Sequence, residues 1–554
     1  MRFMMQKPIS GAEAPPIKVV VVTLDNHLAS AADRAVETLQ KSYPGLQLAF
    51  HAAADFAANE ERLAKCHADI AAGDIIVANM MFLEDHINAV LPALSERAPH
   101  CDAIVGAMSG PEIVRLTRLG DLDMGAPQGG LMKALKKLRG GAGKDPAKAG
   151  GKSQMGLLRA LPKVLRFLPG KAQNLRSYFL TMQYWLAGSE ENFANMIGHL
   201  IDRYAAGPRA VYRGRASIDA PIEYPEEGLY HPDCESRITE RVAALPAGRK
   251  AGAGTVGVLI MRSYVLAGDV GHYDGVIRAL EAQGLDVIPA FASGLDARPA
   301  IEKFFMADGR PCVDAVVSLT GFSLVGGPAY NDAGSAEKIL KQMDVPYIAA
   351  HPLEFQSLED WRGSTGGLTP VEASMMVTIP ELDGATNPII YGGRCASGAQ
   401  CTGCERKCEF PDADPRAMRS CAERAEMLAA RAAKLVAMRR AELAQRKLAI
   451  VLFNFPPNSG AAGTAANLSV FRSLHNLMKA MKREGYTIDV PETLEELKAE
   501  VLEGSSAQYG TDANVLHRIP VDDHVKREPY LAEIEAAWGP APGRKDTDGR
   551  SLFV

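Results

Sequence analysis

The chain lacks several features that would define its class at once. Among its 554 residues no apolar run approaches the roughly 20 residues that a membrane-spanning helix needs. Its first residues contain no apolar core of signal-peptide length. It also has no excess of positive charge, because the formal net charge is −5, which argues against a general nucleic-acid binder. We therefore predict a cytoplasmic protein without transmembrane segments, for which any membrane contact is peripheral.

A complete phosphate-binding P-loop is also missing. Gly151, Lys152 and Ser153 match the end of that motif, but Pro146 occupies the position of its leading glycine. No strand is predicted before it, and backbone N–H groups cradle phosphate only in a strand–loop–helix frame. We therefore predict no ATP site here. The surrounding segment, residues 121–172, is glycine-rich and holds eleven Lys or Arg against three Asp, so we predict a mobile insertion, with membrane or partner docking as the alternative.

The sequence does contain a repeated strand–loop–helix pattern. Residues 255–262 are a short apolar run rich in β-branched side chains, followed by a polar loop to His272 and a helix-period segment at residues 273–283. Further strands are predicted at residues 313–319 and 345–350. Open α/β sheets bind ligands outside the carboxyl ends of their strands. The loops after these strands should therefore line one cleft.

The same rhythm predicts a multidomain α/β fold with open, mostly parallel sheets flanked by helices, helical insertions and a cysteine-rich loop. We predict the following order along the chain: an N-terminal α/β domain (1–120), the basic glycine-rich segment (121–172), a helical and connecting region (173–250), a second α/β domain (251–393), a cysteine cluster with a long helix (394–446) and the start of a further α/β domain (447–554). The last is expected to open with a strand at residues 447–453. Because the sequence stops as another apolar strand begins, we expect it to be the N-terminal portion of a longer polypeptide.

Five of the nine cysteines cluster in one stretch of the sequence. Two residues between thiolates let a turn aim both sulfurs at one centre, and a cytoplasmic location disfavours disulfides. The predicted metal ligands are Cys401, Cys404, Cys408 and Cys421, with Cys395 as an alternative. A 4Fe–4S cluster, a structural Zn²⁺ and free thiols all remain open. The pKa values of these thiols are expected to be lowered by three neighbouring cations: Arg394, Arg406 and Lys407.

Four segments of the chain resemble a known family. They are residues 262–272 (RSYVLAGDVGH), 318–322 (SLTGF), 326–328 (GGP) and 453–458 (FNFPPN). These motifs are similar to those of the CobN/magnesium-chelatase family of large chelatase subunits. The likeness runs from Lys18 to the last residue and is most specific from Thr255 onward.

The resemblance implies a porphyrin-binding subunit of magnesium chelatase, a ligase that forms nitrogen–metal bonds. Such a subunit takes part in the insertion of Mg²⁺ into protoporphyrin IX in (bacterio)chlorophyll biosynthesis, while separate AAA+ partner subunits hydrolyse ATP. It also implies contact with the next methyltransferase of the pathway. The alternatives are a cobaltochelatase large subunit acting on a corrin precursor and a non-catalytic tetrapyrrole-binding or redox-sensing protein. In the resembled family, acidic residues of the central cavity lie beyond residue 554, so part of the active site is expected to be missing.

Substrate contacts are predicted on the loops at the carboxyl ends of the strands. The candidates are Arg262, Asp269, His272, Asn331, His351, Asn454 and Asn458. Arg262 is expected to hold a porphyrin propionate or, alternatively, to pair with Asp269 or Glu354. His272 is a candidate base or a helix cap, and His351 is a candidate base or a hydrogen-bonded structural histidine. No residue is assigned as catalytic from the sequence.

Overall fold

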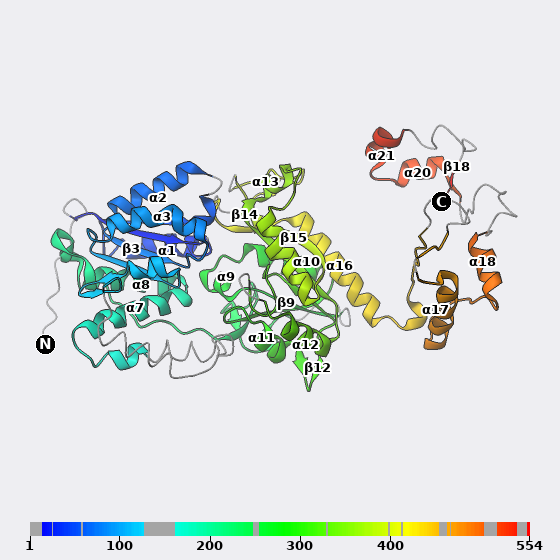
Figure 1. Ribbon diagram of the computed structural model, residues 1–554, viewed down its shortest axis with the longest axis horizontal. Coiled ribbons are helices and arrows are strands. Elements are labelled where there is room, and N and C mark those ends of the chain that lie inside the picture. The colour runs from blue at the N-terminus through cyan, green and yellow to red at the C-terminus, as the bar shows by residue number, and fades with distance from the viewer. Residues whose placement is uncertain are drawn as a thin grey trace. The chain divides into compact units, whose positions relative to one another are not determined.

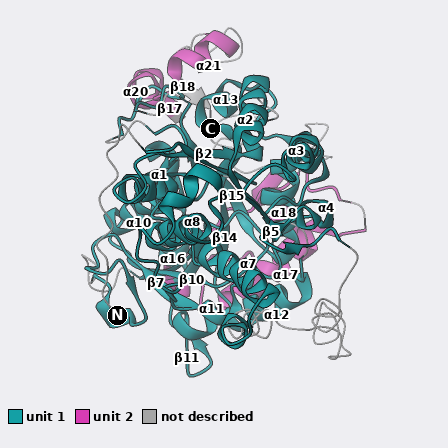
Figure 2. Cartoon of the chain, turned by 90° about the vertical axis from the view of Figure 1, so that its left-hand side faces the viewer, with its two compact units in different colours: residues 1–439 teal, residues 440–554 magenta. Residues whose placement is uncertain are grey.

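The computed structural model divides the chain into two compact units, residues 1–439 and 440–554 (Figure 1, Figure 2). It describes residues 14–24, 26–56, 59–126, 161–246, 254–327, 331–396, 399–410, 414–453, 462–465, 467–502, 518–539 and 551–553. No helix within these ranges is both long enough and apolar enough to cross a membrane.

The first unit begins with a six-stranded sheet in the order β2-β1-β3-β4-β5-β6. Four strands are parallel: β1 (Ile17–Thr23), β2 (Leu46–Ala52), β3 (Ile75–Asn79) and β4 (Ala103–Ala107). Two short antiparallel strands, β5 (Arg118–Leu119) and β6 (Leu122–Asp123), extend it. Strands β1, β3 and β4 are almost continuous apolar runs, as expected for parallel strands covered on both faces.

Helices cover both faces of this first sheet (Figure 1). One face packs against α2 (Glu60–Ala72) and α3 (Glu84–Arg97). The other packs against α1 (Ala29–Leu39), α7 (Lys171–Leu186) and α8 (Glu190–Tyr204). Beyond α8, the buried Tyr212 donates a hydrogen bond to the carbonyl oxygen of Pro15 (2.7 Å) and accepts one from the N–H of Gly45 (3.1 Å). Residues up to Tyr212 therefore belong to the packing of the first sheet.

The second sheet has eight strands in the order β16-β15-β14-β13-β9-β10-β7-β8. They are β7 (Glu227–Tyr230), β8 (Ile238–Thr239), β9 (Thr255–Leu259), β10 (Asp286–Ala292), β13 (Ala315–Ser318), β14 (Tyr347–Ser357), β15 (Thr386–Arg394) and β16 (Met418–Ser420). The five central strands are parallel, with antiparallel strands at both sides. Helices α10 (Gly271–Ala282) and α16 (Ala422–Arg440) cover one face, and α11 (Arg298–Phe304) and α12 (Ala333–Met343) the other. The predicted α/β architecture is confirmed.

Two predicted loops of the second sheet contain regular structure. The segment after β9 forms helix α9 (Arg262–Ala267), which ends at Gly268 in the left-handed conformation (φ 74°). The loop expected after the strand predicted at residues 345–350 is instead a continuation of β14 to Ser357. Pro352 fits within this strand because the pairing with β15 shifts register next to it, so its missing N–H disrupts no regular ladder.

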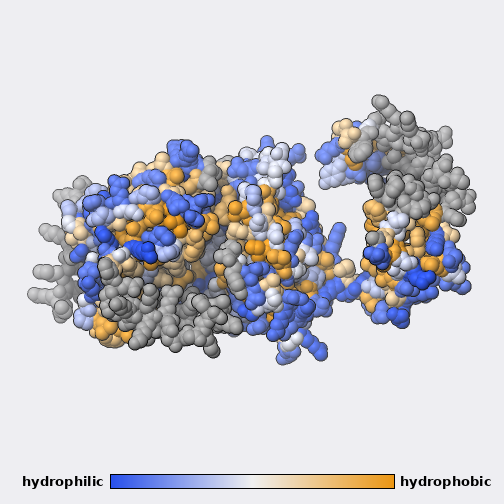
Figure 3. Space-filling model, viewed as in Figure 1, coloured by the Kyte–Doolittle hydropathy of each residue, from blue (hydrophilic) through white to orange (hydrophobic). Residues whose placement is uncertain are grey.

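The second unit contains four labelled helices and one strand pair within the described residues. They are α17 (Val470–Glu484), α18 (Leu494–Leu502), α20 (Val521–Arg527), α21 (Leu531–Trp538) and the antiparallel pair β17 (Arg518–Pro520) and β18 (Ser551–Phe553). The strand predicted at residues 447–453 is wrong, because these residues form no strand and pair with none of the described strands. Val451 is 91% and Phe453 64% exposed, although the carbonyl oxygen of Phe453 accepts the N–H of Gly463 at 2.8 Å. Apolar side chains also lie on the surface of this unit in Figure 3.

Candidate functional site

The carboxyl ends of β9 and β13 meet at the point where the second sheet reverses its strand order. The next strand after β9 in the chain, β10, lies on one side of it, whereas β13 lies on the other. Open α/β sheets bind ligands in the crevice at such a point. A cavity of about 30 Å³ lies there, lined among others by Met261, Asp296, Ser318, Thr320, Phe322 and Ser323. Since one water needs roughly 10–15 Å³, this cavity holds about two waters and has no room for a porphyrin.

The loop after β13 is held in place by Asp383, the last residue of helix α15 (Ile379–Asp383). Its buried carboxylate accepts hydrogen bonds from the hydroxyl of Ser323 and the backbone N–H of Leu324, both at 2.7 Å. In the same loop Gly327 has φ 83°, and a Cβ there would lie 2.4 Å from a methyl carbon of Leu295. The glycine-rich loop is evident from the sequence, whereas Asp383 is too distant in the chain for any local pattern to reveal its role.

We expect the substitution Asp383→Ala to loosen the loop after β13. It removes the acceptor from two buried donors, which costs about 1–3 kcal/mol of local stability. Hydrogen exchange at the amides of Leu324 and Val325, compared with those of β13, measures the effect. Asp383→Asn retains one acceptor oxygen, so its exchange rates at these amides should lie between those of Asp383→Ala and the wild type. Equal exchange in Asp383→Ala and the wild type would contradict the assignment.

Arg262 joins helix α9 to the connection between the two sheets. Its guanidinium donates to the carbonyl oxygens of Pro225 at 2.9 Å and Tyr224 at 3.1 Å, with Leu186 at 3.5 Å. These carbonyls use the donors that a porphyrin propionate would require. The contacts therefore give Arg262 a structural role in this conformation.

Asp269 is buried below the same loop. Its carboxylate accepts the backbone N–H of Met418 at 3.0 Å, which links the loop after β9 to the edge strand β16. Burial raises the pKa of Asp269 to about 7, although the Met418 hydrogen bond and the positive charge of Arg394 oppose this rise. Asp269 is thus a buried carboxyl group that titrates near neutral pH.

His272 is completely buried at the start of helix α10. Its ring lies among those of Tyr264, Tyr273 and Tyr391, at centroid distances of 5.0, 3.8 and 6.1 Å. Neither ring nitrogen has a hydrogen-bond partner among the described residues, so the side chain does not cap the helix. Burial lowers the pKa of His272 to about 3, which keeps the imidazole neutral at physiological pH.

The remaining predicted contacts are spread over the fold. His351 lies inside β14, next to Ala350, whose side chain packs in the core under α10. Strand alternation therefore places His351 on the other face of the sheet from His272. Burial lowers the pKa of His351 to about 4, and both its ring nitrogens lack a partner within the described ranges. Asn331 is half-buried just before α12, while Asn454 and Asn458 lie outside the described residues.

Four of the clustered cysteines lie in the segment between β15 and β16, residues 395–417, which we call the cysteine insert, and Cys421 directly follows β16. A bridge between Gln400 and Glu409, and a 2.8 Å hydrogen bond from the N–H of Cys401 to the carbonyl of Cys408, fold it back on itself. Cys395 and Cys401 are buried in one small apolar cluster, against which Cys408 and Cys421 pack. The cysteines that cluster in the sequence are therefore also close together in the fold.

Glu359 completes the closest group of potential ligand atoms. One of its carboxylate oxygens and the sulfurs of Cys395 and Cys401 all lie within 4.8 Å of one another. Glu359, in helix α13 (Leu358–Gly363), also accepts the backbone N–H groups of Ala396 at 3.0 Å and Thr402 at 3.4 Å. Cysteine spacing alone gave no signal for this carboxylate, because it comes from another element of the second sheet.

The pKa values of Cys395, Cys401 and Cys421 are raised and not lowered, contrary to the prediction. Arg406 pairs with Glu426 at 2.8 Å, and Arg394 forms its ion pairs outside the insert. Burial instead raises the pKa of the Cys395 and Cys401 thiols. These thiols stay protonated until a cation displaces their protons, which is the usual behaviour of cysteine metal ligands.

Comparison with known proteins adds a family to this geometry. Residues 182–554 match the family described as CobN/Magnesium Chelatase, and residues 18–179 match a domain of unknown function (DUF3479). The chain is 51% identical over 99% of its length to the magnesium-chelatase H subunit of Cereibacter sphaeroides, and 49% identical over 97% to that of Rhodobacter capsulatus. A solved structure, the catalytic subunit of cobaltochelatase from Mycobacterium tuberculosis, covers 98% of the chain with a TM-score of 0.53 at 17% identity, which supports the fold.

The matches also define how much of these proteins the chain represents. It covers 46% of the Cereibacter protein, 44% of the Rhodobacter protein and 38% of the Mycobacterium structure. The chain thus spans about half the length of the curated relatives it matches.

Proposed function

Because the chain belongs to the CobN/magnesium chelatase family, we propose that it is part of a porphyrin-binding chelatase subunit. Its substrate is proposed to be protoporphyrin IX, which receives Mg²⁺ in (bacterio)chlorophyll biosynthesis while AAA+ partner subunits hydrolyse ATP. The observation that carries this proposal is the 51% identity to a magnesium-chelatase H subunit along almost the whole chain. The cobaltochelatase alternative has less support, since the match to the CobN protein of an aerobic cobaltochelatase from Sinorhizobium sp is 27% identical over 51% of the chain.

Metal insertion sets two chemical requirements. The two pyrrole N–H groups must lose protons to a nearby base, and Mg²⁺ needs oxygen ligands that replace its water shell. Asp269, His272 and His351 are all enclosed by protein, and the cavity at the end of β9 holds only about two waters. We therefore assign none of them as the base. Porphyrin binding at this edge requires the loops after β9 and β13 to move apart.

Titration with protoporphyrin IX tests the proposal. The three tryptophans report on different regions: Trp185 in α7, Trp361 in α13 beside the cysteine insert and Trp538 in the second unit. We expect saturable quenching together with a change in porphyrin absorption, and single Trp→Phe variants to show which region approaches the ligand. Absence of saturable binding would contradict porphyrin binding by this chain. Tighter binding of a corrin precursor would favour the cobaltochelatase alternative.

The cysteine insert supports a second proposed role, that of a metal centre. A 4Fe–4S cluster takes four thiolates, for which Cys401, Cys404, Cys408 and Cys421 are the proposed ligands, with Cys395 as an alternative. A Zn²⁺ ion takes four sulfur, nitrogen or oxygen ligands, for which Cys395, Cys401 and Glu359 already lie close together. Either centre, when bound, supplies the positive charge that these buried thiols lack and cross-links the insert.

We expect Cys401→Ser to lose most of the bound metal, because Cys401 belongs to both ligand sets. Iron, acid-labile sulfide and zinc are measured after anaerobic purification. Cys312→Ser, which changes an exposed cysteine outside the insert, is the matched control. Cys395→Ser should remove zinc but leave in place an iron–sulfur cluster held by Cys401, Cys404, Cys408 and Cys421; loss of the cluster would indicate that Cys395 is one of its ligands. Unchanged metal content in Cys401→Ser would contradict a metal centre in this insert.

A further inference from the structure

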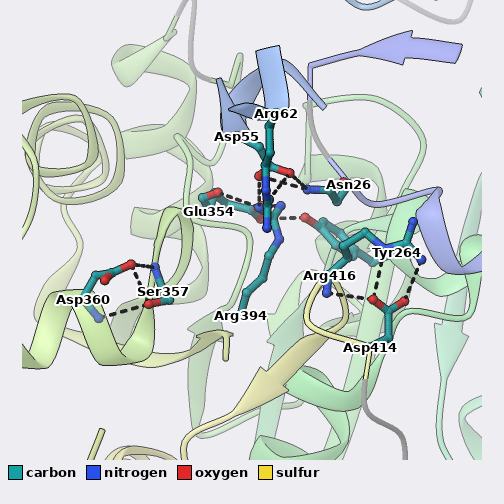
Figure 4. A network of polar contacts seen from close by, with 10 residues as sticks. All are labelled: Asn26, Asp55, Arg62, Tyr264, Glu354, Ser357, Asp360, Arg394, Asp414 and Arg416. Atoms are coloured by element: carbon teal, nitrogen blue, oxygen red, sulfur yellow. Dashed lines mark hydrogen bonds and ion pairs between the residues drawn. The ribbon is translucent and has the colours of Figure 1, made fainter. Parts of the chain in front are cut away.

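A buried ion-pair group joins the cysteine insert to the first sheet. Arg394, the last residue of β15, directly precedes Cys395 and lies between Glu354 of β14 and Asp55 (Figure 4). Its guanidinium is 3.6 Å from the Asp55 carboxylate, 3.5 Å from the Glu354 carboxylate and 3.1 Å from the Glu354 carbonyl oxygen. The side chains of Arg394, Asp55 and Glu354 are only 12%, 19% and 15% exposed. Ion pairs with this little solvent are weakly screened.

Both carboxylates of this group are held by other parts of the fold. Asp55 follows β2 of the first sheet and receives the amide of Asn26 at 3.1 Å and the guanidinium of Arg62 at 2.8 Å. Glu354 accepts the hydroxyl of Tyr264, in helix α9, at 2.7 Å. The Arg394 guanidinium therefore connects Glu354 of β14, and through it Tyr264 of helix α9, with Asp55 of the first sheet's domain (Figure 4).

The other end of the cysteine insert makes a parallel contact. Arg416 is hydrogen-bonded to Asp414 at 3.0 Å and forms an ion pair with Asp33 of helix α1. The insert thus contacts the first sheet's domain through one arginine before its cysteines and one after them. Cys401, Cys404 and Cys408 lie between these two arginines in the chain.

We infer that the cysteine insert is a clasp whose metal occupancy controls the docking of the first sheet's domain on the second sheet. This inference rests on the proposed metal centre. A metal that draws the cysteines together fixes Cys395, and hence the adjacent Arg394 against Asp55, and it holds Arg416 against Asp33. Without the metal, the insert loses this cross-link and both arginine contacts weaken. In this proposal, the docking of the domain of unknown function at residues 18–179 depends on whether the cysteines hold a metal.

Hydrogen exchange of the 554-residue chain tests the clasp. The chain is compared after reconstitution with Fe²⁺ and sulfide, after loading with Zn²⁺ alone, and after chelator treatment, with metal content measured each time. We expect removal of the metal to speed exchange at residues 26–34 and 53–56 by about tenfold, because a charged hydrogen-bonding partner is lost there. Arg394→Gln should give the same increase at residues 53–56 without loss of metal, and chelator should then add little at these residues while still affecting residues 26–34 through Arg416 and Asp33.

Two matched variants complete the experiment. Arg298→Gln removes an arginine whose partner, Asp296 at 2.7 Å, lies in the same turn, and it should leave both segments protected. Arg394→Lys keeps the positive charge and should restore most of the protection that Arg394→Gln loses. Far-UV circular dichroism confirms that each variant is folded.

The two proposals fail in different ways. A wild-type chain that retains neither iron nor zinc overturns the metal centre and, with it, the metal control of the clasp. A chain that binds metal but shows the same exchange at residues 26–34 and 53–56 with and without it overturns the clasp alone. Porphyrin titration of the same samples is a separate readout, so its result bears only on the proposed chelatase role.

Discussion

Replacing Asp269 by asparagine should stabilise the first unit above pH 7 and make its stability less dependent on pH. Burial raises the pKa of Asp269 to about 7, far above that of an unfolded aspartate. Between pH 4 and pH 7 the folded chain therefore keeps a proton that the unfolded chain has released. The free energy of unfolding falls as the pH rises through this window, by about 4 kcal/mol in total, and stays lower above it.

Asparagine removes this dependence because it carries no charge, and its amide oxygen can still accept the N–H of Met418. Urea unfolding of the wild type and Asp269→Asn, measured at intervals from pH 4 to pH 8.5, gives the difference directly. Asp308→Asn is the matched control: Asp308 lies in an exposed turn with φ 50°, a conformation that asparagine also tolerates. A constant difference between the wild type and Asp269→Asn across this range would contradict the raised pKa.

The second large effect is expected from His272→Phe, which should raise the melting temperature. The substitution removes two ring nitrogens that are buried without hydrogen bonds, each a desolvation cost of about 1–3 kcal/mol, and keeps a ring among the three tyrosines. The gain should increase at pH 5. Burial lowers the pKa of His272 to about 3, so between pH 6.5 and pH 3 the unfolded chain binds a proton that the folded chain excludes.

Thermal unfolding at pH 7 and pH 5 measures both parts of this prediction. His199→Phe is the matched control, since His199 is also buried in the first unit but bonds the hydroxyl of Ser177 at 3.0 Å. That control loses a hydrogen bond and should gain no stability at pH 7. Burial also lowers the pKa of His199 to about 4, so the pH 5 measurement is compared with the pH 7 value of the same variant. A destabilised His272→Phe at both pH values would mean that the imidazole makes a favourable polar contact. A stabilised variant that also binds porphyrin less well would indicate that the histidine is kept for function.

The regular parts of the fold follow closely from local sequence pattern. β-branched apolar runs mark β9 and β13, and the 3.6-residue period marks α10 and α8, because helices on both faces bury these elements in a predictable way. The pattern fails where two signals conflict. Gly268, Asp269 and Gly271 suggest a loop and obscure the short helix α9, while Pro352 suggests the end of a strand that in fact continues to Ser357.

The site was harder to predict because its decisive contacts are not local. The spacing of the cysteines identified the cluster, because short spacings between cysteines favour turns that bring their sulfurs together. Glu359, Asp383 and Asp55 reach their partners only through the packing of separate elements. Burial of Cys395 raises the pKa of its thiol, opposite to the prediction. Arg406, one of the cations expected to lower it, is already paired with Glu426.

Helix α7 (Lys171–Leu186) has a consequence for anyone who divides or recombines this protein. The two family matches meet within it, at residues 179 and 182, although the whole helix packs against the first sheet. A chain cut there loses α8 and Tyr212 and leaves an apolar sheet face open to aggregation. Ile222 still exchanges two hydrogen bonds with Asn192 of α8, so a gene fusion or crossover that preserves this packing belongs after Ile222. The structural unit is therefore longer than the segment matched by the first family.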